Sequence, residues 1–255
     1  MKTVVLASGS KGNSTLVFND DTKILIDFGM SYNYIYNSLK ELNINIDDIN
    51  AILITHTHID HIKGLNLLIK NNDSIIYATV ELEKELKKLY PNGNYIIYDE
   101  TTTIGSLNIE HFKTSHDSGE SLGFIVSENN KSLVYLTDTG CIKEKLYDKL
   151  KNKNMYIIES NHDIDMLCTG SYPYELKRRI LGDKGHLSNK DMCEHFVRLM
   201  GKNTNTIVLA HLSKENNTEE KALAEFKNCL NNYNKKIKKI VVAKQDERSE
   251  IIEIW

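Results

Sequence analysis

The stretch AILITHTHIDHIKGL, residues 51–65, joins an apolar run to a cluster of three histidines and one aspartate. Residues 51–54 are wholly apolar, which is typical of a strand inside a covered sheet. His56, His58, Asp60 and His61 follow within six positions, and helical spacing then begins. Residues two apart on extended backbone point to one side, so His56 and His58 can share one ion while Asp60 and His61 reach a neighbouring one. Imidazole and carboxylate ligands predict zinc, manganese or, less favoured, iron, and exclude calcium.

The overall composition is ordinary for a soluble globular protein, with 40% hydrophobic and 26% charged residues in 255. A formal net charge of −3 gives no global attraction to nucleic acid or to anionic membranes, although a local basic patch stays open. No apolar run has the length of a signal peptide core or a membrane span. The four cysteines are widely spaced. We therefore expect a cytoplasmic protein that does not bind membranes and whose thiols are free.

Strand and helix patterns alternate along the whole chain. Antiparallel turns come early in each half and strand–helix units come late, with only two prolines and no low-complexity linker. This pattern predicts a single α/β domain over residues 1–255, in which two sheets pack together and helices cover the outside.

Further candidate ligands stand just after other predicted strands. His116 follows the segment 107–115, Asp138 ends 132–138, and His211 ends 206–211. Ligand-type residues that recur at strand ends are what a site at one edge of a sheet requires. His111 is the alternative to His116, but it lies inside the strand. His195 lies within a predicted helix, where a packing or surface role is expected.

The motif HTHIDH, residues 56–61, resembles the H-x-H-x-D-H signature of the metallo-β-lactamase superfamily. Its remaining motifs follow in order in ILIDFG, TSHDS, TDTG and LAHLS. The resemblance implies an αββα sandwich, with two mixed sheets between outer helices, and two divalent metal ions. It places one ion on His56, His58 and His116, the other on Asp60, His61 and His211, with Asp138 bridging them and Asp27 orienting the histidine loop through hydrogen bonds.

Three polar loops are candidates for binding a phosphate: SGSKGNST (8–15), ESNHD (159–163) and GHLSN (185–189). Exposed amides, hydroxyls and a helix N-terminus attract anions, although a glycine turn without a ligand is the alternative for the first loop. The basic stretch LKRRI (176–180) is equally compatible with an anion site or a solvated helix face. The side chains expected to contact substrate are Ser10, Lys11, Asn13, Ser160, Asn161, His162, His186 and Ser188.

Three residues are expected to act in catalysis. Asp60 and Asp138 can hold an ion and also orient a water molecule or accept its proton. His186 stands before a predicted helix, and its imidazole can donate to a phosphate oxygen or to the departing oxygen. The alternative for His186 is a structural role at the start of that helix.

These loops, together with YPYELKRRI (172–180) and LAHLSKENN (209–217), resemble the YycJ (WalJ) family of metallo-β-lactamase-fold proteins, described as 5′–3′ exonuclease-like on DNA. The resemblance implies a dinuclear phosphodiesterase that hydrolyses nucleic acid, with DNA the expected substrate. Two alternatives stay open. One is a hydrolase of a small cyclic phosphate or a thioester, which the acidic net charge favours slightly. The other is a metal-bound regulatory partner without catalysis, against which the complete ligand set counts.

Overall fold

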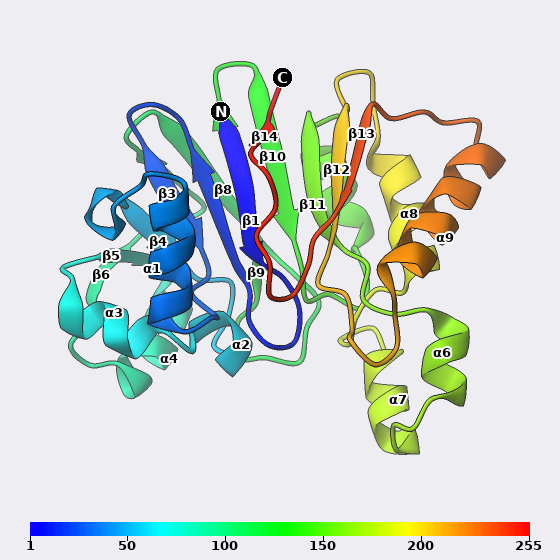
Figure 1. Cartoon of the computed structure of the whole chain (residues 1–255), viewed down its shortest axis with the longest axis horizontal. Coiled ribbons are helices and arrows are strands. Elements are labelled where there is room, and N and C mark those ends of the chain that lie inside the picture. The colour runs from blue at the N-terminus through cyan, green and yellow to red at the C-terminus, as the bar shows by residue number, and fades with distance from the viewer.

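Two seven-stranded sheets lie face to face at the centre of the protein (Figure 1). The structure is a computed structural model, and it describes all residues 1–255. The first sheet has the order β14-β1-β2-β3-β4-β5-β6 and the second the order β13-β12-β11-β10-β9-β8-β7. The first comprises β1 (Lys2–Ala7), β2 (Ser14–Phe18), β3 (Lys23–Ile26), β4 (Ala51–Leu53), β5 (Ile75–Ala78), β6 (Asn94–Ile97) and β14 (Ile252–Glu253). The second comprises β7 (Thr101–Ile104), β8 (Leu107–Lys113), β9 (Leu122–Glu128), β10 (Lys131–Leu136), β11 (Met155–Glu159), β12 (Thr206–Ala210) and β13 (Lys239–Val242).

Helices cover the outer face of each sheet, with α1, α3 and α4 outside the first and α8 and α9 outside the second (Figure 1). The early helices are α1 (Tyr32–Glu41), α2 (Ile59–Ile62), α3 (Leu65–Asn71) and α4 (Val80–Leu89). The later ones are α5 (Tyr147–Leu150), α6 (Ile164–Thr169), α7 (Tyr174–Ile180), α8 (Asn189–Leu199) and α9 (Glu219–Asn232), and two 3-10 turns span Ile46–Asp48 and Glu144–Leu146. The predicted αββα architecture is therefore confirmed. None of these helices combines the length and apolar character needed to cross a membrane.

Hydrophobic burial explains which segments became central strands. All three residues of β4 are buried, and the strand pairs in parallel with β3 and β5. Strands β11 and β12 are also fully buried and parallel to each other. Parallel strands covered on both faces have nearly continuous apolar sequences. These three fit that pattern, with a polar residue only at the end of β11 and at the start of β12. One core cluster of 41 buried residues draws on both sheets, and a second of 22 lies mainly between the second sheet and its helices.

The helical segment after the histidine cluster is broken by Gly64 into α2 and α3. The amide of Gly64 donates to the carbonyl of Phe28 at 3.0 Å, and a Cβ at this position would meet the carbonyl oxygen of Met30 at 2.3 Å. Glycine therefore allows α2, which carries Asp60 and His61, to pack closely on the loop after β3.

The prediction that the four cysteines are free thiols is wrong for two of them. Cys193 on α8 and Cys229 on α9 form a disulfide, whereas Cys141 and Cys168 are free. The two partners are 36 residues apart, and they meet because α8 and α9 pack side by side on the second sheet. No local spacing rule reports such a contact between helices.

Candidate metal centre

The candidate ligands converge because both sheets deliver strand ends to one edge. Asp27 follows β3, the histidine cluster follows β4, Asp138 follows β10 and His211 follows β12. Parallel pairing of β3 with β4, and of β10 and β12 with β11, aligns the carboxyl ends of these strands. His116 joins them from the loop after β8. Side chains from four parallel strands and one antiparallel strand thus meet where the two sheets adjoin.

The seven predicted ligands form overlapping groups whose ligand atoms lie within 4.8 Å of one another. The groups are His56–His58–His116, Asp60–His61–His211 and His56–His61–Asp138, and a fourth group joins Asp138 and His211 to Glu159 and His186.

Asp138 lies between the first two groups. Its Oδ2 is 3.2 Å from His61 Nε2, and its Oδ1 is 3.6 Å from His211 Nε2 and 3.8 Å from His116 Nε2. This is the position that a bridging carboxylate requires.

Unpaired polar atoms at the centre fit divalent metal ions. His56 Nε2, His211 Nε2 and Asp138 Oδ2 are buried and have no hydrogen-bond partner in the protein. A buried polar atom without a partner costs about 1–3 kcal/mol, so three of them in one place indicate a missing positive partner. Imidazole nitrogen and carboxylate oxygen are donors that divalent transition metals accept.

The charges at the centre keep the carboxylates of Asp60 and Asp138 ionised, which favours binding of a cation. Burial acts to raise the pKa of Asp60 and of Asp138, but His211 and His61 outweigh it and hold each pKa below its ordinary value. Burial also lowers the pKa of His56 well below its ordinary value. Its imidazole is therefore neutral, as a metal ligand must be.

Asp27 contacts the histidine loop from outside the candidate ligand set. Its Oδ2 accepts from His61 Nδ1 at 2.7 Å, and its Oδ1 accepts from the amide of Thr55 at 2.8 Å. Burial raises the pKa of Asp27, against the opposing effect of His61. The hydrogen bond to Nδ1 leaves Nε2 of His61 facing the centre, which is how carboxylates commonly fix metal-binding histidines.

The backbone turns sharply where three of these side chains leave their strands. Asp27, Asp138 and His211 have φ values of 63°, 53° and 55°. Residues other than glycine rarely adopt this left-handed conformation, although Asp and His are among the enriched types. Such strain concentrates at functional sites, and here it accompanies the three turns that aim side chains at the centre.

Glu159 is a candidate site residue that the sequence analysis did not single out. Its Oε1 accepts from Nδ1 of both His186 and His211 at 2.7 Å, and the residue is fully buried at the end of β11. Burial acts to raise its pKa, but His186 and His211 outweigh it and hold the pKa at about 2. The available signal was a carboxylate at the end of an apolar strand, the same position as the other site residues.

His186 borders the metal centre. Its ring centroid is 5.2 Å from that of His116 and 5.4 Å from that of His211. Burial would lower its pKa, but Glu159 raises it above the ordinary value. Since Nδ1 is bound by Glu159, Nε2 is the atom left for a substrate.

Two predicted substrate residues near the N-terminus have other contacts. Asn13 is buried, and its amide nitrogen is 3.3 Å from Asp60 Oδ2 and 3.1 Å from His61 Nε2. Lys11 pairs with Asp246 at 3.5 Å on the surface. Asn13 thus supports the ligands rather than facing solvent.

Three other predicted substrate residues are not available to a substrate, contrary to the prediction. The hydroxyl of Ser160 is buried and donates to Asn189, and Ser188 caps α8 by accepting from the amide of Asp191. His162 is also buried, and burial lowers its pKa to about 4. These side chains organise the base of the site.

The structure also decides between the remaining histidines. His111 stays in β8 and belongs to none of the ligand groups, whereas His116 does. His195 lies on α8 and hydrogen-bonds to the hydroxyl of Tyr147. The preference for His116 and the packing role of His195 both agree with the geometry.

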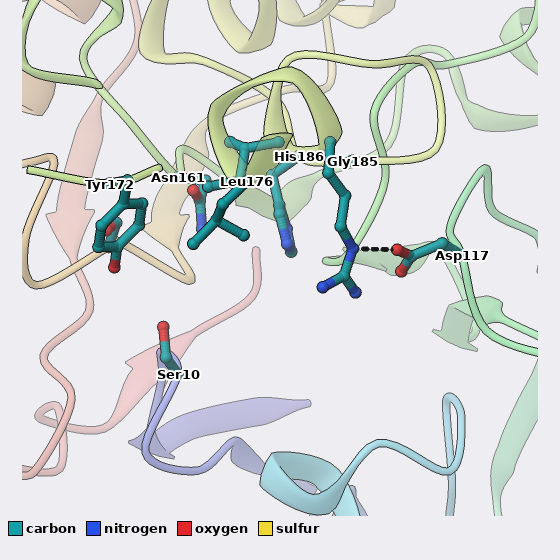
Figure 2. Close-up of a pocket in the computed structure, with 10 residues that line it drawn as sticks. Ser10, Asp117, Asn161, Tyr172, Leu176, Gly185 and His186 are labelled. Atoms are coloured by element: carbon teal, nitrogen blue, oxygen red, sulfur yellow. Dashed lines mark hydrogen bonds and ion pairs between the residues drawn. The ribbon is translucent and has the colours of Figure 1, made fainter. Parts of the chain in front are cut away.

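A pocket of about 170 Å³ opens beside the centre (Figure 2). It includes the predicted residues Ser10, Asn161 and His186, and α7 forms one wall. The full lining is Ser10, Asp117, Asn161, Tyr172, Leu176, Arg179, Ile180, Gly185, His186 and Ser213. The carbonyl of Gly185 is 3.3 Å from His116 Nδ1, so the pocket and the ligand set share a border.

Comparisons with known proteins identify the family of the chain. Residues 22–212 match the family described as the beta-lactamase superfamily domain. The chain is 41% identical over 233 residues to exodeoxyribonuclease WalJ of Streptococcus pneumoniae serotype 2, covering 89% of this chain and 87% of that protein. It is 38% identical over 223 residues to exodeoxyribonuclease YycJ of Bacillus anthracis, covering 86% and 84%.

A solved structure has the same fold. The metallo-beta-lactamase fold protein YhfI of Bacillus subtilis superimposes with a TM-score of 0.73 at 17% identity, covering 98% of this chain and all of that one. The chain therefore belongs to the beta-lactamase superfamily and, within it, to the family of WalJ and YycJ.

Proposed function

We propose that this protein is a metal-dependent exonuclease that hydrolyses the phosphodiester bonds of DNA in the cytoplasm. The observation that carries the proposal is the convergence of seven candidate metal-binding side chains in a chain 38–41% identical, over most of its length, to two proteins named as exodeoxyribonucleases. The two sheets contribute to one shared centre, which supports treating residues 1–255 as a single domain.

The ligand set supports two ions rather than one. His56, His58 and His116 form one group of three nitrogen donors. A separate group of two histidines and Asp60 lies on the other side of Asp138. Zinc and manganese suit these donors. Bound divalent ions would supply the Lewis acidity that in-line hydrolysis of a phosphodiester needs.

The protein's own groups supply orientation and proton transfer. The carboxylates of Asp60 and Asp138 are ionised and can accept the proton of the attacking water. His186 Nε2 can donate a proton to the departing oxygen, while Glu159 holds the opposite ring nitrogen. His186 Nδ1 lies 3.9 Å from Asp138 Oδ1, so the candidate acid and the candidate base belong to the same site.

Substrate competition tests this function. Protein reconstituted with Zn²⁺ or Mn²⁺ is assayed on end-labelled single- and double-stranded DNA, matched RNA, a cyclic nucleotide, a thioester and a β-lactam. We expect stepwise shortening of DNA from an end, with kcat/KM highest on DNA and very low on the β-lactam. Asp138→Asn protein, purified in parallel, controls for contaminating nucleases.

The net charge of −3 favours one alternative, a hydrolase of small phosphates, because tracking along a phosphate backbone is helped by basic surface. A higher kcat/KM on the cyclic nucleotide or the thioester than on DNA would establish that alternative. DNA binding without turnover of any substrate would instead support a regulatory role.

A further inference from the structure

Arg179 on α7 presents free guanidinium nitrogens beside the metal centre. Its Nε donates to Asp117 Oδ2, and Asp117 Oδ1 lies 3.6 Å from His116 Nε2. The guanidinium is thus separated from a candidate ligand by a single carboxylate. Its two terminal nitrogens have no partner in the protein, and 59% of the side chain is exposed. Two parallel N–H groups of a guanidinium match two oxygens of a phosphate.

Uncharged donors complete a polar side of the same pocket. The amide of Asn161 is fixed by the carbonyl of His211 at 2.9 Å, and Ser213 Oγ accepts from the amide of Asn216 at 3.2 Å, which leaves its proton free. Ser10 faces Asn161 and His186 across the opening (Figure 2). Hydroxyl and amide groups of this kind bind phosphate oxygens without adding charge.

The rest of the pocket is apolar and limited in size. Tyr172, Leu176 and Ile180 line it, and an aromatic ring is a surface on which a base can stack. The pocket has a volume of only about 170 Å³ and is open to solvent. We expect a space of this size to hold one phosphate with part of its nucleotide.

We propose that this pocket binds the terminal nucleotide of the DNA strand, with Arg179 holding a phosphate monoester at the strand end. The inference rests on the proposed nuclease function. The adjacent phosphodiester would then fall at the metal centre, and the small size of the pocket would favour cleavage at strand ends. Since the Asp117–Arg179 pair has no net charge, the attraction comes from the terminal guanidinium N–H groups and the neutral donors.

Strands that differ only at their ends test the pocket. The metal-loaded full chain is assayed on one single-stranded sequence carrying a 5′-phosphate, a 3′-phosphate or hydroxyls at both ends. We expect kcat/KM for one phosphate-ended strand to exceed that for the hydroxyl-ended strand by about 10–100-fold, the range of a hydrogen bond to a charged group. The two phosphate arms identify which end is bound.

Two variants of neighbouring arginines locate the effect. In Arg179→Gln, kcat/KM for the phosphate-ended strand should exceed that for the hydroxyl-ended strand by no more than about threefold. Arg178→Gln, a change at an exposed residue that does not line the pocket, should keep the wild-type preference. Equal wild-type rates on all three strands, or a preference that survives Arg179→Gln, would overturn the assignment.

A double variant separates phosphate binding from the effect of leaving Asp117 unpaired. In Asp117→Asn/Arg179→Gln the exposed carboxylate is gone, so a preference that returned would show that Arg179 only neutralises Asp117. A preference still absent supports direct binding. Hydrolysis of bis-p-nitrophenyl phosphate without cleavage of any DNA strand would contradict the proposed function itself, and with it this pocket.

Discussion

Glu159 Oε1 accepts a hydrogen bond from His211 Nδ1 at 2.7 Å, and the carboxylate is fully buried. The bond fixes the imidazole so that Nε2 points toward Asp60 and Asp138, at 3.7 Å and 3.6 Å. The same oxygen holds His186. One buried carboxylate therefore sets the direction of a candidate ligand and of the candidate proton donor.

Replacing Glu159 with Gln should weaken the site without unfolding the protein. The amide keeps the size of the side chain but loses the charge that fixes His211, so metal affinity or kcat should fall by about 10–100-fold. Competition with a chelating dye and steady-state kinetics measure the two quantities. Glu144→Gln, at an exposed glutamate, is the matched control. Unchanged affinity and kcat would mean that the contact is structural only.

Asp138→Asn should abolish turnover and reduce the metal content from two ions per chain. Asn retains the shape of the side chain and tolerates the left-handed backbone at φ 53°, whereas Ala would add strain to the loss of charge. Elemental analysis gives the stoichiometry, and circular dichroism checks the fold. A wild-type rate in this variant would exclude the bridging role.

His186→Ala should retain both ions and lower kcat by about 10²–10⁴, the usual effect of losing a general acid or base. The reason is that the ring borders His116 and His211 while its Nδ1 is held by Glu159. Metal content and kcat are measured on the same preparation. Loss of an ion would instead identify His186 as a ligand, and unchanged kcat would leave it a structural residue.

Removing the ions with a chelator should abolish activity and lower Tm. Without the ions, the buried atoms of His56, His211 and Asp138 have no partner. A ligand present at 100 times its Kd adds about 2.7 kcal/mol to the free energy of unfolding. For a chain of this size, losing that contribution lowers Tm by roughly 5–10 °C. Calorimetry before and after adding Zn²⁺ measures it. The Tm of Asp138→Asn protein should rise less on adding Zn²⁺ than the Tm of the wild type. An equal rise in the two proteins would argue against metal binding at this centre.

The stability of the metal-free protein should depend on Glu159 at acid pH. Its folded-state pKa of about 2 lies below the ordinary value of 4.5. The stabilisation is therefore fully present above about pH 4.5 and is lost as the pH falls toward 2. Urea unfolding between pH 2 and 7 gives the free energy of unfolding of the wild type and of Glu159→Gln at each pH. The two free energies should approach each other below about pH 4.5. A constant separation across that range would contradict the assigned pKa.

The sequence by itself determined the fold class and singled out the candidate metal-binding side chains. Residues 51–61 carry an apolar strand and four ligand-type residues within a few positions, so local spacing was enough to indicate a metal site. The alternation of strands and helices along the whole chain indicated two packed sheets. Asp138 and His211 could be found because each stands at the end of an apolar strand, and parallel strands place such ends together.

Only the tertiary structure decided the contacts between segments that are distant along the chain. Glu159 and His211 are 52 residues apart, and Cys193 and Cys229 are 36 apart, so no periodicity relates them. Ser160 belonged to a polar loop by sequence, but folding buried its hydroxyl against Asn189. Which face a loop residue presents depends on how α7 and α8 pack against the strands, and that packing is a property of the assembled core rather than of local sequence.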